Sequence, residues 1–197
     1  MRTCLSPSQA LLLVHFDSTS ALCGGSLIDS RTVLTAAHCF FFGAEKAYYV
    51  EVFLGVHNKS EVDRKEVIQE ALLMERVSIH PNYLPQQNDI ALVFLHKKVN
   101  WLEYPHIRPI CLPSPTHKID DFQGHFAVAT GWGKTCTRCP EAEVLQEADL
   151  VIQSHSTCTS KYPNKNVTTG MLCAFGQTRG EDTCKGGLWP FLVQASL

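Results

Sequence analysis

Two short segments of the chain contain side chains that could act together in acyl transfer. Residues 34–39, Leu-Thr-Ala-Ala-His-Cys, supply His38, and residues 88–92, Asn-Asp-Ile-Ala-Leu, supply Asp89. Acyl transfer by a serine needs a base that takes the hydroxyl proton, a carboxylate that fixes the tautomer of the base, and backbone N–H donors that hold the oxyanion. His38 and Asp89 are therefore candidates for the base and for the carboxylate that orients it.

The bulk composition is that of a folded globular protein. The chain has 197 residues, enough for one large or two small domains, and is 45% hydrophobic and 18% charged. Its net charge of −2 gives no electrostatic reason to bind nucleic acid or an anionic membrane. No apolar run approaches the ~20 residues that a transmembrane helix needs. We therefore predict neither a nucleic-acid partner nor a membrane partner.

The cysteine content indicates a secreted, extracellular protein held together by disulfides. The nine cysteines are spread along the chain and do not form the paired knuckles of a zinc site. Two glycosylation sequons, at Asn58 and Asn166, agree with this interpretation, although such triplets are common by chance. The cysteines stand at positions 4, 23, 39, 111, 136, 139, 158, 173 and 184.

The first residues resemble a signal peptide only superficially. Residues 10–14 are apolar and follow Met1 and Arg2, but this run is shorter than the usual ~7–15 residues and no small-residue cleavage site follows it. We interpret the run as a buried strand. A secreted type of protein would carry a leader, so we expect the amino terminus of this sequence to be incomplete.

Most of the chain reads as short strands separated by turn residues. Helical periodicity is weak, with single turns expected around residues 36–38 and 156–161. A proline-rich crossing at residues 104–115 divides the chain near its middle. Many short strands indicate a β-sandwich or β-barrels. The expected strands cover residues 9–16, 26–35, 47–54, 71–80, 90–94, 125–130, 147–153 and 171–175.

Five motifs then occur in the order and rough spacing of a known family. They lie at residues 23–28, 35–39, 88–92, 109–113 and 131–133. Together they resemble a trypsin-like serine protease of the chymotrypsin family, from about Gln9 to Gly186. The resemblance implies an all-β fold of two packed antiparallel β-barrels. We expect residues 1–107 to form the first barrel and residues 108–197 to form the crossing and a second barrel that is incomplete at its carboxyl end.

The resemblance also assigns roles to single residues. It makes His38 the general base and Asp89 the orienting carboxylate, whereas outside these motifs they would be a core histidine and a loop aspartate. It places Asp182 at the base of the specificity pocket, where a carboxylate would pair with Arg or Lys of a substrate. The alternative for Asp182 is a solvated loop acid. Gly186 corresponds to the glycine of the oxyanion hole.

For the cysteines, the resemblance implies specific pairings. Cys23 and Cys39 should form a bridge beside the histidine, and Cys158 and Cys173 should form one across the second barrel. Cys184 matches a cysteine whose partner lies further downstream. Cys111 matches one that often joins a propeptide, a partner that Cys4 could replace. Cys136 and Cys139 could serve a redox or zinc role, but a loop bridge is the favoured interpretation, and the odd total leaves at least one thiol unpaired within the chain.

The resemblance argues against a metal site. The calcium loop of the family aligns with residues 56–66, where Val56 replaces a carboxylate and Glu66 matches the far end. Losing one oxygen ligand weakens a calcium site. We therefore predict no metal and no cofactor.

Three departures from the family pattern bear on activity. Where the family has Gly-Asp-Ser-Gly-Gly-Pro, the chain reads Gly186-Gly187-Leu188-Trp189-Pro190, without the aspartate and the serine. No Ile-Val-Gly-Gly start precedes the first strand, and the chain ends before the last strands and the terminal helix of the family. Gly-Leu-Trp-Pro can be encoded by codons that contain Asp-Ser-Gly in a shifted frame, so we hypothesise a frameshift or a gene-model error.

Two classes of function remain open. In the first, the intact protein is a secreted trypsin-like endopeptidase that cleaves after Arg or Lys, and the chain as written is inactive. In the second, the chain is a non-catalytic homologue that acts as a binding or regulatory module. Its partners would be protein or peptide substrates with Arg or Lys, or protein inhibitors.

Overall fold

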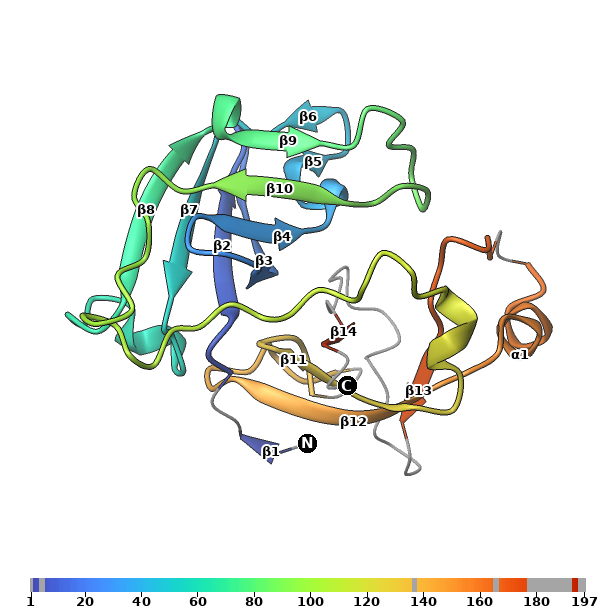
Figure 1. Ribbon diagram of the computed structural model, residues 1–197. Coiled ribbons are helices and arrows are strands. Elements are labelled where there is room, and N and C mark those ends of the chain that lie inside the picture. The colour runs from blue at the N-terminus through green and yellow to red at the C-terminus, as the bar shows by residue number, and fades with distance from the viewer. Residues whose placement is uncertain (1, 4–5, 136–137, 165–166, 177–192, 195–197) are drawn as a thin grey trace.

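The computed structural model describes residues 2–3, 6–135, 138–164, 167–176 and 193–194. The fold is all-β. A seven-stranded sheet and a five-stranded sheet make up most of it, and a two-stranded hairpin lies beside the first of these (Figure 1). Among the described residues, no helix is long and apolar enough to cross a membrane.

The seven-stranded sheet forms the first half of the molecule. Its strand order is β8-β7-β2-β3-β4-β10-β9, and every neighbouring pair is antiparallel. The sheet carries residues from positions 9 to 94, so one continuous stretch of chain builds it. The strands are β2 (Gln9–His15), β3 (Ser20–Leu27), β4 (Thr32–Thr35), β7 (Tyr49–Leu54), β8 (Ile68–Leu73), β9 (Val77–Ile79) and β10 (Ala91–Phe94).

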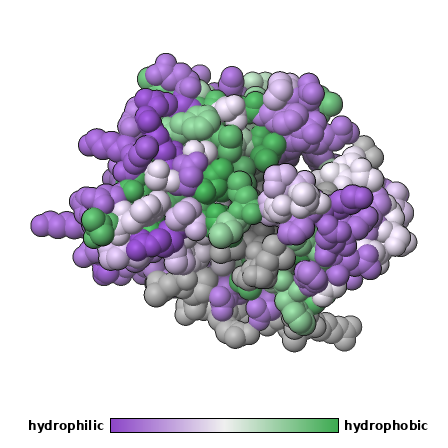
Figure 2. Space-filling view, in the orientation of Figure 1, coloured by the Kyte–Doolittle hydropathy of each residue, from purple (hydrophilic) through white to green (hydrophobic). Residues whose placement is uncertain are grey.

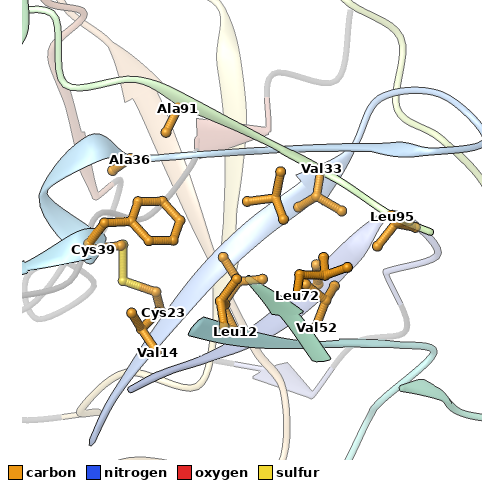
Figure 3. Packing of buried hydrophobic residues seen from close by; sticks show 14 of the residues in the cluster. Leu12, Val14, Cys23, Val33, Ala36, Cys39, Val52, Leu72, Ala91 and Leu95 are labelled. Atoms are coloured by element: carbon orange, nitrogen blue, oxygen red, sulfur yellow. A yellow bond between two sulfur atoms is a disulfide. The ribbon is translucent and has the colours of Figure 1, made fainter. Parts of the chain in front are cut away.

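Alternation of side chains along these strands produces the main core. Leu12 and Val14 on β2 point to the same face as Val50 and Val52 on β7, and all four are fully or almost fully buried. Figure 3 shows several of these side chains packed together with the disulfide between Cys23 and Cys39. Burying each large aliphatic side chain contributes about 1.5–3 kcal/mol, so this cluster is the main stabilising element of the first half.

The five-stranded sheet forms the second half. The order is β1-β12-β11-β14, and β13 also pairs with β12. Because β1 pairs with β12, residues near the start of the chain belong to this sheet. The helix α1 (His155–Lys161) follows β12, and Ser154 caps it by accepting a hydrogen bond from the Thr157 N–H. The strands are β1 (Arg2–Thr3), β11 (Phe126–Gly131), β12 (Gln146–Ile152), β13 (Ala174–Gly176) and β14 (Val193–Gln194).

Buried contacts join the two halves. The Thr130 hydroxyl on β11 donates a hydrogen bond of 2.7 Å to the Gln9 side chain on β2, and both residues are buried. The Trp132 indole N–H donates to the His57 carbonyl, and Trp132 packs in a small apolar cluster with Leu11.

In the view of Figure 2, hydrophobic side chains gather near the middle of the visible face and hydrophilic side chains surround them.

The strands differ from expectation in several places. Residues 20–25, which were not expected to be a strand, form most of β3, while β8 begins three residues before the expected start and β13 begins three residues after it. A turn at residues 28–31 divides the expected strand 26–35, where the Arg31 N–H donates to the Asp29 side chain. The 3-10 turn η3 (Met74–Arg76) divides the expected strand 71–80. The helical turns predicted near residues 36–38 and 156–161 are present as η1 (Ala37–Phe40) and α1. The remaining short elements are β5 (Phe41–Phe42), β6 (Glu45–Lys46), η2 (Lys59–Glu61) and η4 (Ile119–Phe122).

The two disulfides expected from the resemblance are confirmed. Cys23 is bonded to Cys39, and Cys158 is bonded to Cys173. Cys139 is also disulfide-bonded, whereas Cys111 is an exposed free thiol. The expectations for Cys4, Cys136 and Cys184 concern positions outside the described residues.

Candidate active site

His38 lies in η1, immediately after β4 ends. The β4 strand stops at Thr35, and Ala36 is still extended, so the chain can turn into a single 3-10 turn that begins at Ala37. The Phe41 N–H donates to the His38 carbonyl and closes this turn. The Cys23–Cys39 disulfide ties the residue after His38 to β3. The backbone is therefore restrained both before and after His38, by the end of β4 and by the disulfide at Cys39.

Close packing of β3 against β4 helps to position the turn that carries His38. A Cβ atom at Gly25 would lie 2.7 Å from a methyl group of Val33 and 3.1 Å from the Leu34 carbonyl oxygen. Only glycine allows the strands to pack this closely. The Thr35 hydroxyl also donates a hydrogen bond of 2.7 Å to the Gly24 carbonyl. The glycines of the segment 23–28 thus help to set the position of the strand that leads to His38.

Asp89 lies at the end of a loop that closes on itself. The His80 N–H donates to the Ile90 carbonyl, so the two ends of the loop meet. Asn88, directly before Asp89, has a φ of 50°, which is in the left-handed region that asparagine tolerates better than most residues. The Asn88 side-chain amide donates a hydrogen bond of 2.8 Å to the Asn82 carbonyl. Asn88 therefore fixes the direction in which the Asp89 side chain leaves the backbone.

The structure brings His38 and Asp89 together through two hydrogen bonds. His38 Nδ1 lies 2.5 Å from Asp89 Oδ2, and the His38 backbone N–H donates to Asp89 Oδ1 at 2.8 Å. An ionised carboxylate only accepts hydrogen bonds, so Nδ1 carries the proton and Nε2 is left as the basic nitrogen. The side chains remain 34% and 29% exposed, so the histidine can be reached from solvent. This arrangement can take a proton from a nucleophile at Nε2.

The surroundings of Asp89 favour its charged form. Burial alone raises the pKa of the Asp89 carboxyl, but hydrogen bonds from the His38 side chain and backbone, the charge of His38 and the Ala37 N–H together hold that pKa below its usual value. The Asp89 carboxylate also shifts the pKa of the neighbouring Tyr83. Burial and the charge of Asp89 both raise the pKa of the Tyr83 phenol. Asp89 is thus ionised at neutral pH, as the orientation of His38 requires.

An aromatic pair that the sequence did not indicate flanks His38 and Asp89. Phe41 stacks on Tyr83, with ring centroids 5.3 Å apart and ring planes inclined by 23°. The two residues are 42 positions apart in the sequence, and neither segment carries a signal for the other. Asn88 is a further residue that sequence analysis missed as a positioning element, and an asparagine directly before Asp89 was the available signal.

The other predicted positions either lie outside the described residues or belong to the loop that was aligned with the calcium site. Asp182 and Gly186 lie outside the described residues. In the loop aligned with the calcium site of the family, the Val56 side chain is buried in the apolar cluster that contains Trp132. The Glu66 carbonyl accepts a hydrogen bond from His106 Nε2. Within the described part of the chain, no group of three or more His, Cys, Asp or Glu side chains is placed to hold a metal ion.

Among the described residues, no serine hydroxyl forms a hydrogen bond to His38. Its ring is hydrogen-bonded to Asp89. The described residues therefore show a histidine hydrogen-bonded to a carboxylate, without a serine hydroxyl on that histidine.

The chain is similar to known serine proteases. The trypsin family model matches residues 5–187. Serine protease 7 of Drosophila melanogaster is 34% identical over 179 residues, which cover 83% of this chain and 44% of that protein. CLIP domain-containing serine protease B9 of Anopheles gambiae is 35% identical over 183 residues, covering 83% of this chain and 43% of that protein.

Two further similarities extend the comparison. The proclotting enzyme of Tachypleus tridentatus is 35% identical over 173 residues, covering 85% of this chain and 46% of the enzyme. The chain thus spans less than half the length of these curated relatives. The solved structure of HL collagenase has a TM-score of 0.71 and 28% identity, and the match covers 96% of this chain and 76% of that one. The chain belongs to the trypsin family of serine proteases and has its two-barrel, chymotrypsin-type fold.

Proposed function

We propose that this chain carries the general base and the orienting carboxylate of a trypsin-like serine endopeptidase. His38 is the base and Asp89 orients it. The observation that carries the proposal is the pair of hydrogen bonds from the His38 ring and backbone to the two oxygens of one carboxylate. Membership in the trypsin family supports this assignment, because the pair then lies in a fold that uses such a pair for proteolysis.

We further propose that the polypeptide as written does not hydrolyse peptide bonds. The motif that should supply the nucleophile reads Gly186-Gly187-Leu188-Trp189-Pro190 and contains no serine. Members of a triad act as a unit, and removing one leaves only the roughly 10³–10⁴-fold contribution of binding and the oxyanion hole. The loop that should form that oxyanion hole, at Gly186, is altered as well.

For the intact protease, we propose cleavage after Arg or Lys. Asp182 lies two residues before Cys184, and a buried carboxylate there would form a charge-assisted bond with a basic substrate side chain. The substrates would be proteins or peptides, and protein inhibitors could occupy the same site. We place the division between the two barrels near residues 107 and 108, in the crossing segment.

A restoration experiment tests these assignments. The segment from Lys185 onward is replaced by Gly-Asp-Ser-Gly-Gly-Pro and the barrel end of a related protease, and an activatable Ile-Val-Gly-Gly start is placed before β2. Activity on Arg and Lys amides should appear and should be lost in His38→Ala. Asp182→Ser should abolish the basic preference, because losing a buried charge partner costs about 2–5 kcal/mol. A restored enzyme that prefers aromatic or small side chains would show that Asp182 is a solvated loop acid.

We also propose that the protein is extracellular and that Asn58 carries an N-glycan. The two disulfides are consistent with an oxidising compartment. Asn58 Oδ1 accepts hydrogen bonds from both the backbone N–H and the hydroxyl of Ser60, so the asparagine and serine of this sequon are already in contact. Asn166, the second proposed glycan site, lies outside the described residues. Enzymatic deglycosylation of protein from a secretory host should lower its mass, and Asn58→Gln should remove part of that change.

A second candidate function is a non-catalytic homologue that binds partners through the protease surface. The observation that favours it is the retention of the hydrogen-bonded His38–Asp89 pair in a chain whose motif lacks the serine. Sequencing the transcript across the Gly186–Gly187 junction separates the candidates. An Asp-Ser-Gly reading in another frame supports the protease, and a clean transcript without one supports the homologue.

A further inference from the structure

A second histidine is hydrogen-bonded to both a serine and a carboxylate, on the outward face of the first sheet. The Ser20 hydroxyl lies 2.9 Å from His15 Nδ1, and His15 Nε2 lies 3.0 Å from Glu51 Oε2. The Gln69 side-chain amide donates to the other oxygen of Glu51 at 3.2 Å. We call Ser20, His15, Glu51 and Gln69 the outer-face array. The array is separate from His38 and Asp89, and the family motifs do not include it.

Strand register alone brings these four residues together. They lie on β3, β2, β7 and β8, which are consecutive neighbours in the sheet. Ser20 pairs directly with His15 across the β2–β3 hairpin. Tyr49 pairs with His15 on the other side, so Glu51, two residues further along β7, is its diagonal neighbour. Diagonal neighbours on one face of a sheet are within reach of long side chains, so the array is a direct product of the pairing.

The positions of the base and the carboxylate are well restrained. The His15 ring lies flat on the Tyr49 ring, with centroids 4.1 Å apart and planes inclined by 8°. The side chains of His15 and Glu51 are only 15% and 22% exposed, less than those of His38 and Asp89. Ser20, in contrast, is exposed, so a small reagent can reach its hydroxyl while the base beneath it is sheltered.

The turn that precedes Ser20 is held as well. The Phe16 N–H donates to the Thr19 carbonyl and closes the hairpin. The Ser18 N–H and hydroxyl both donate to one carboxylate oxygen of Glu45 on β6. These contacts keep the β2–β3 turn in one conformation, and so they fix the position of Ser20 relative to the His15 ring.

The hydrogen-bond pattern determines where the proton lies on His15. An ionised Glu51 only accepts, so His15 Nε2 must donate to it. In the neutral ring, Nδ1 is then the unprotonated nitrogen, and it accepts the proton of the Ser20 hydroxyl. The array thus contains a nucleophile, a base and a residue that fixes the tautomer of the base, in the roles of a catalytic triad but with the two ring nitrogens exchanged.

From this geometry we propose that Ser20 is a nucleophilic serine that is acylated by small activated esters. Ser20 Oγ attacks the acyl carbon and forms a new C–O bond, while its proton moves to His15 Nδ1. The bond from the acyl carbon to the aryloxide then breaks, and the aryloxide leaves with the electron pair and takes the proton from His15. The products are acyl-Ser20 and a phenol. Glu51 is a positioning residue because it acts through His15.

The exposed position of Ser20 limits the reactions that the outer-face array can support. Ser20 stands on the exposed face of a sheet, and rapid acyl turnover requires donors that hold the oxyanion. We therefore expect acylation of Ser20 by reactive esters and no hydrolysis of peptide bonds. The proposal does not depend on His38, on Asp89 or on the proposed protease function.

Labelling the full chain with 4-nitrophenyl acetate at neutral pH tests the proposal. Peptide mapping by mass spectrometry gives the acetylation rate at each serine. Ser60 is the internal reference, because it is also exposed but its hydroxyl donates to the Asn58 amide and not to a histidine. We expect Ser20 to react about 100-fold faster than Ser60, in line with the ~10²–10⁴ typical of general-base assistance.

Three variants separate a nucleophilic role from a structural one. Ser20→Ala should remove the rapid label, and His15→Asn should slow labelling of Ser20 at least tenfold. Glu51→Gln should slow it without changing the Ser60 rate or the melting temperature. His38→Ala should leave the Ser20 rate unchanged, which keeps this test independent of the protease site.

Two results would overturn the proposal. One is a Ser20 rate in the unmodified chain that is no higher than the Ser60 rate, a comparison that needs no variant to fold. The other is an unchanged Ser20 rate in a folded His15→Asn or Glu51→Gln protein, which would reduce the array to a set of structural hydrogen bonds.

Discussion

The first barrel holds two histidine–carboxylate pairs, and they are constructed in different ways. His38 and Asp89 come from a 3-10 turn and from the end of a loop, 51 residues apart. His15 and Glu51 come from adjacent strands, and their contact follows from the ladder between them. The first pair needs a disulfide, a close glycine packing and a left-handed asparagine to place it. The second needs only the register of the sheet.

The comparison shows that the hydrogen bonds of a triad do not by themselves make a complete catalytic site. The array at Ser20 contains all three roles of a triad but lies on an open sheet face. The His38–Asp89 pair lies in the fold of a protease family but has no serine bonded to it among the described residues. The loops and turns hold His38 and Asp89 against each other, whereas strand register brings the outer-face array together on an open face of the sheet.

The largest effect should come from removing the disulfide beside His38. Replacing both Cys23 and Cys39 by alanine should lower the free energy of unfolding by about 3 kcal/mol, because the bridge closes a loop of about 15 residues. Both cysteines are also buried in the core. Urea unfolding at pH 7 measures the loss. The low-field Nδ1 proton resonance of His38 should broaden, while the Ser20 labelling rate of the folded protein stays the same.

The disulfide between Cys158 and Cys173 provides the control. It closes a loop of similar length in the second half of the molecule. Its removal should also destabilise the protein, but it should leave the His38 resonance unchanged. Equal disturbance of His38 by both double variants would contradict the local role that we assign to Cys23–Cys39.

A smaller effect is expected from removing the charge of Asp89. Asp89→Asn should cost about 2 kcal/mol at pH 7, since charge-assisted hydrogen bonds contribute about 1.5–3 kcal/mol. The folded-state pKa of Asp89 is lowered, so its contribution is complete above the unfolded value of about 4 and is lost as the pH falls through the folded value. The difference between parent and variant should therefore shrink below about pH 4. A difference that does not change with pH would show that Asp89 is not ionised in the folded state.

Replacing the residue that orients Asp89 should have a still smaller effect. Asn88→Ala should cost about 1–2 kcal/mol, because alanine is strained at positive φ and cannot bond to the Asn82 carbonyl. Asn88→Gly removes the same hydrogen bond but tolerates the backbone, and so it should cost less than Asn88→Ala. Thermal unfolding of the two variants would show this order. Equal losses in the two variants would mean that the side-chain hydrogen bond, which both of them lack, and not the backbone strain accounts for the cost.

The smallest effect on stability is expected at the outer-face array. Glu51→Gln should change the free energy of unfolding by less than about 1 kcal/mol, because glutamine can still accept the hydrogen bond from His15 Nε2 and a single hydrogen bond contributes only about 0.5–1.5 kcal/mol. Its effect should be seen in the acylation rate of Ser20 and not in the unfolding curve. A loss of several kcal/mol would place Glu51 among the structural residues of the sheet.

Sequence reasoning succeeded where a local motif fixes the residue. His38 and Asp89 lie in contiguous motifs and are hydrogen-bonded to each other, while their catalytic roles stay predictions. The pairing of Cys23 with Cys39 followed from the same resemblance and is confirmed. The apolar run at residues 10–14 indicated a buried strand, which the structure has at Gln9–His15. The two-barrel fold could be predicted for the same reason, because the order of the motifs is a property of the chain alone.

Features that depend on pairing could not be predicted. Ser20, His15 and Glu51 meet only when three strands are aligned in one register, and no local pattern specifies that register. The turn at Asp29 and Arg31 was missed although residues 29–31 are polar and typical of a turn, because the apolar residues on both sides were taken as one strand. The contact of Phe41 with Tyr83 likewise joins two loops, and neither segment carries a signal for the other.

The most direct test of the account is an amide-hydrolysis assay of the purified chain. Peptide amides of Arg and Lys serve as substrates, and the His38→Ala variant serves as the blank. The account predicts that the two proteins release product at the same background rate, because no serine among the described residues is hydrogen-bonded to His38 and residues 186–190 contain no serine. Hydrolysis clearly above the blank, and blocked by a serine-directed phosphonate, would show that a nucleophile reaches His38 and would contradict the account.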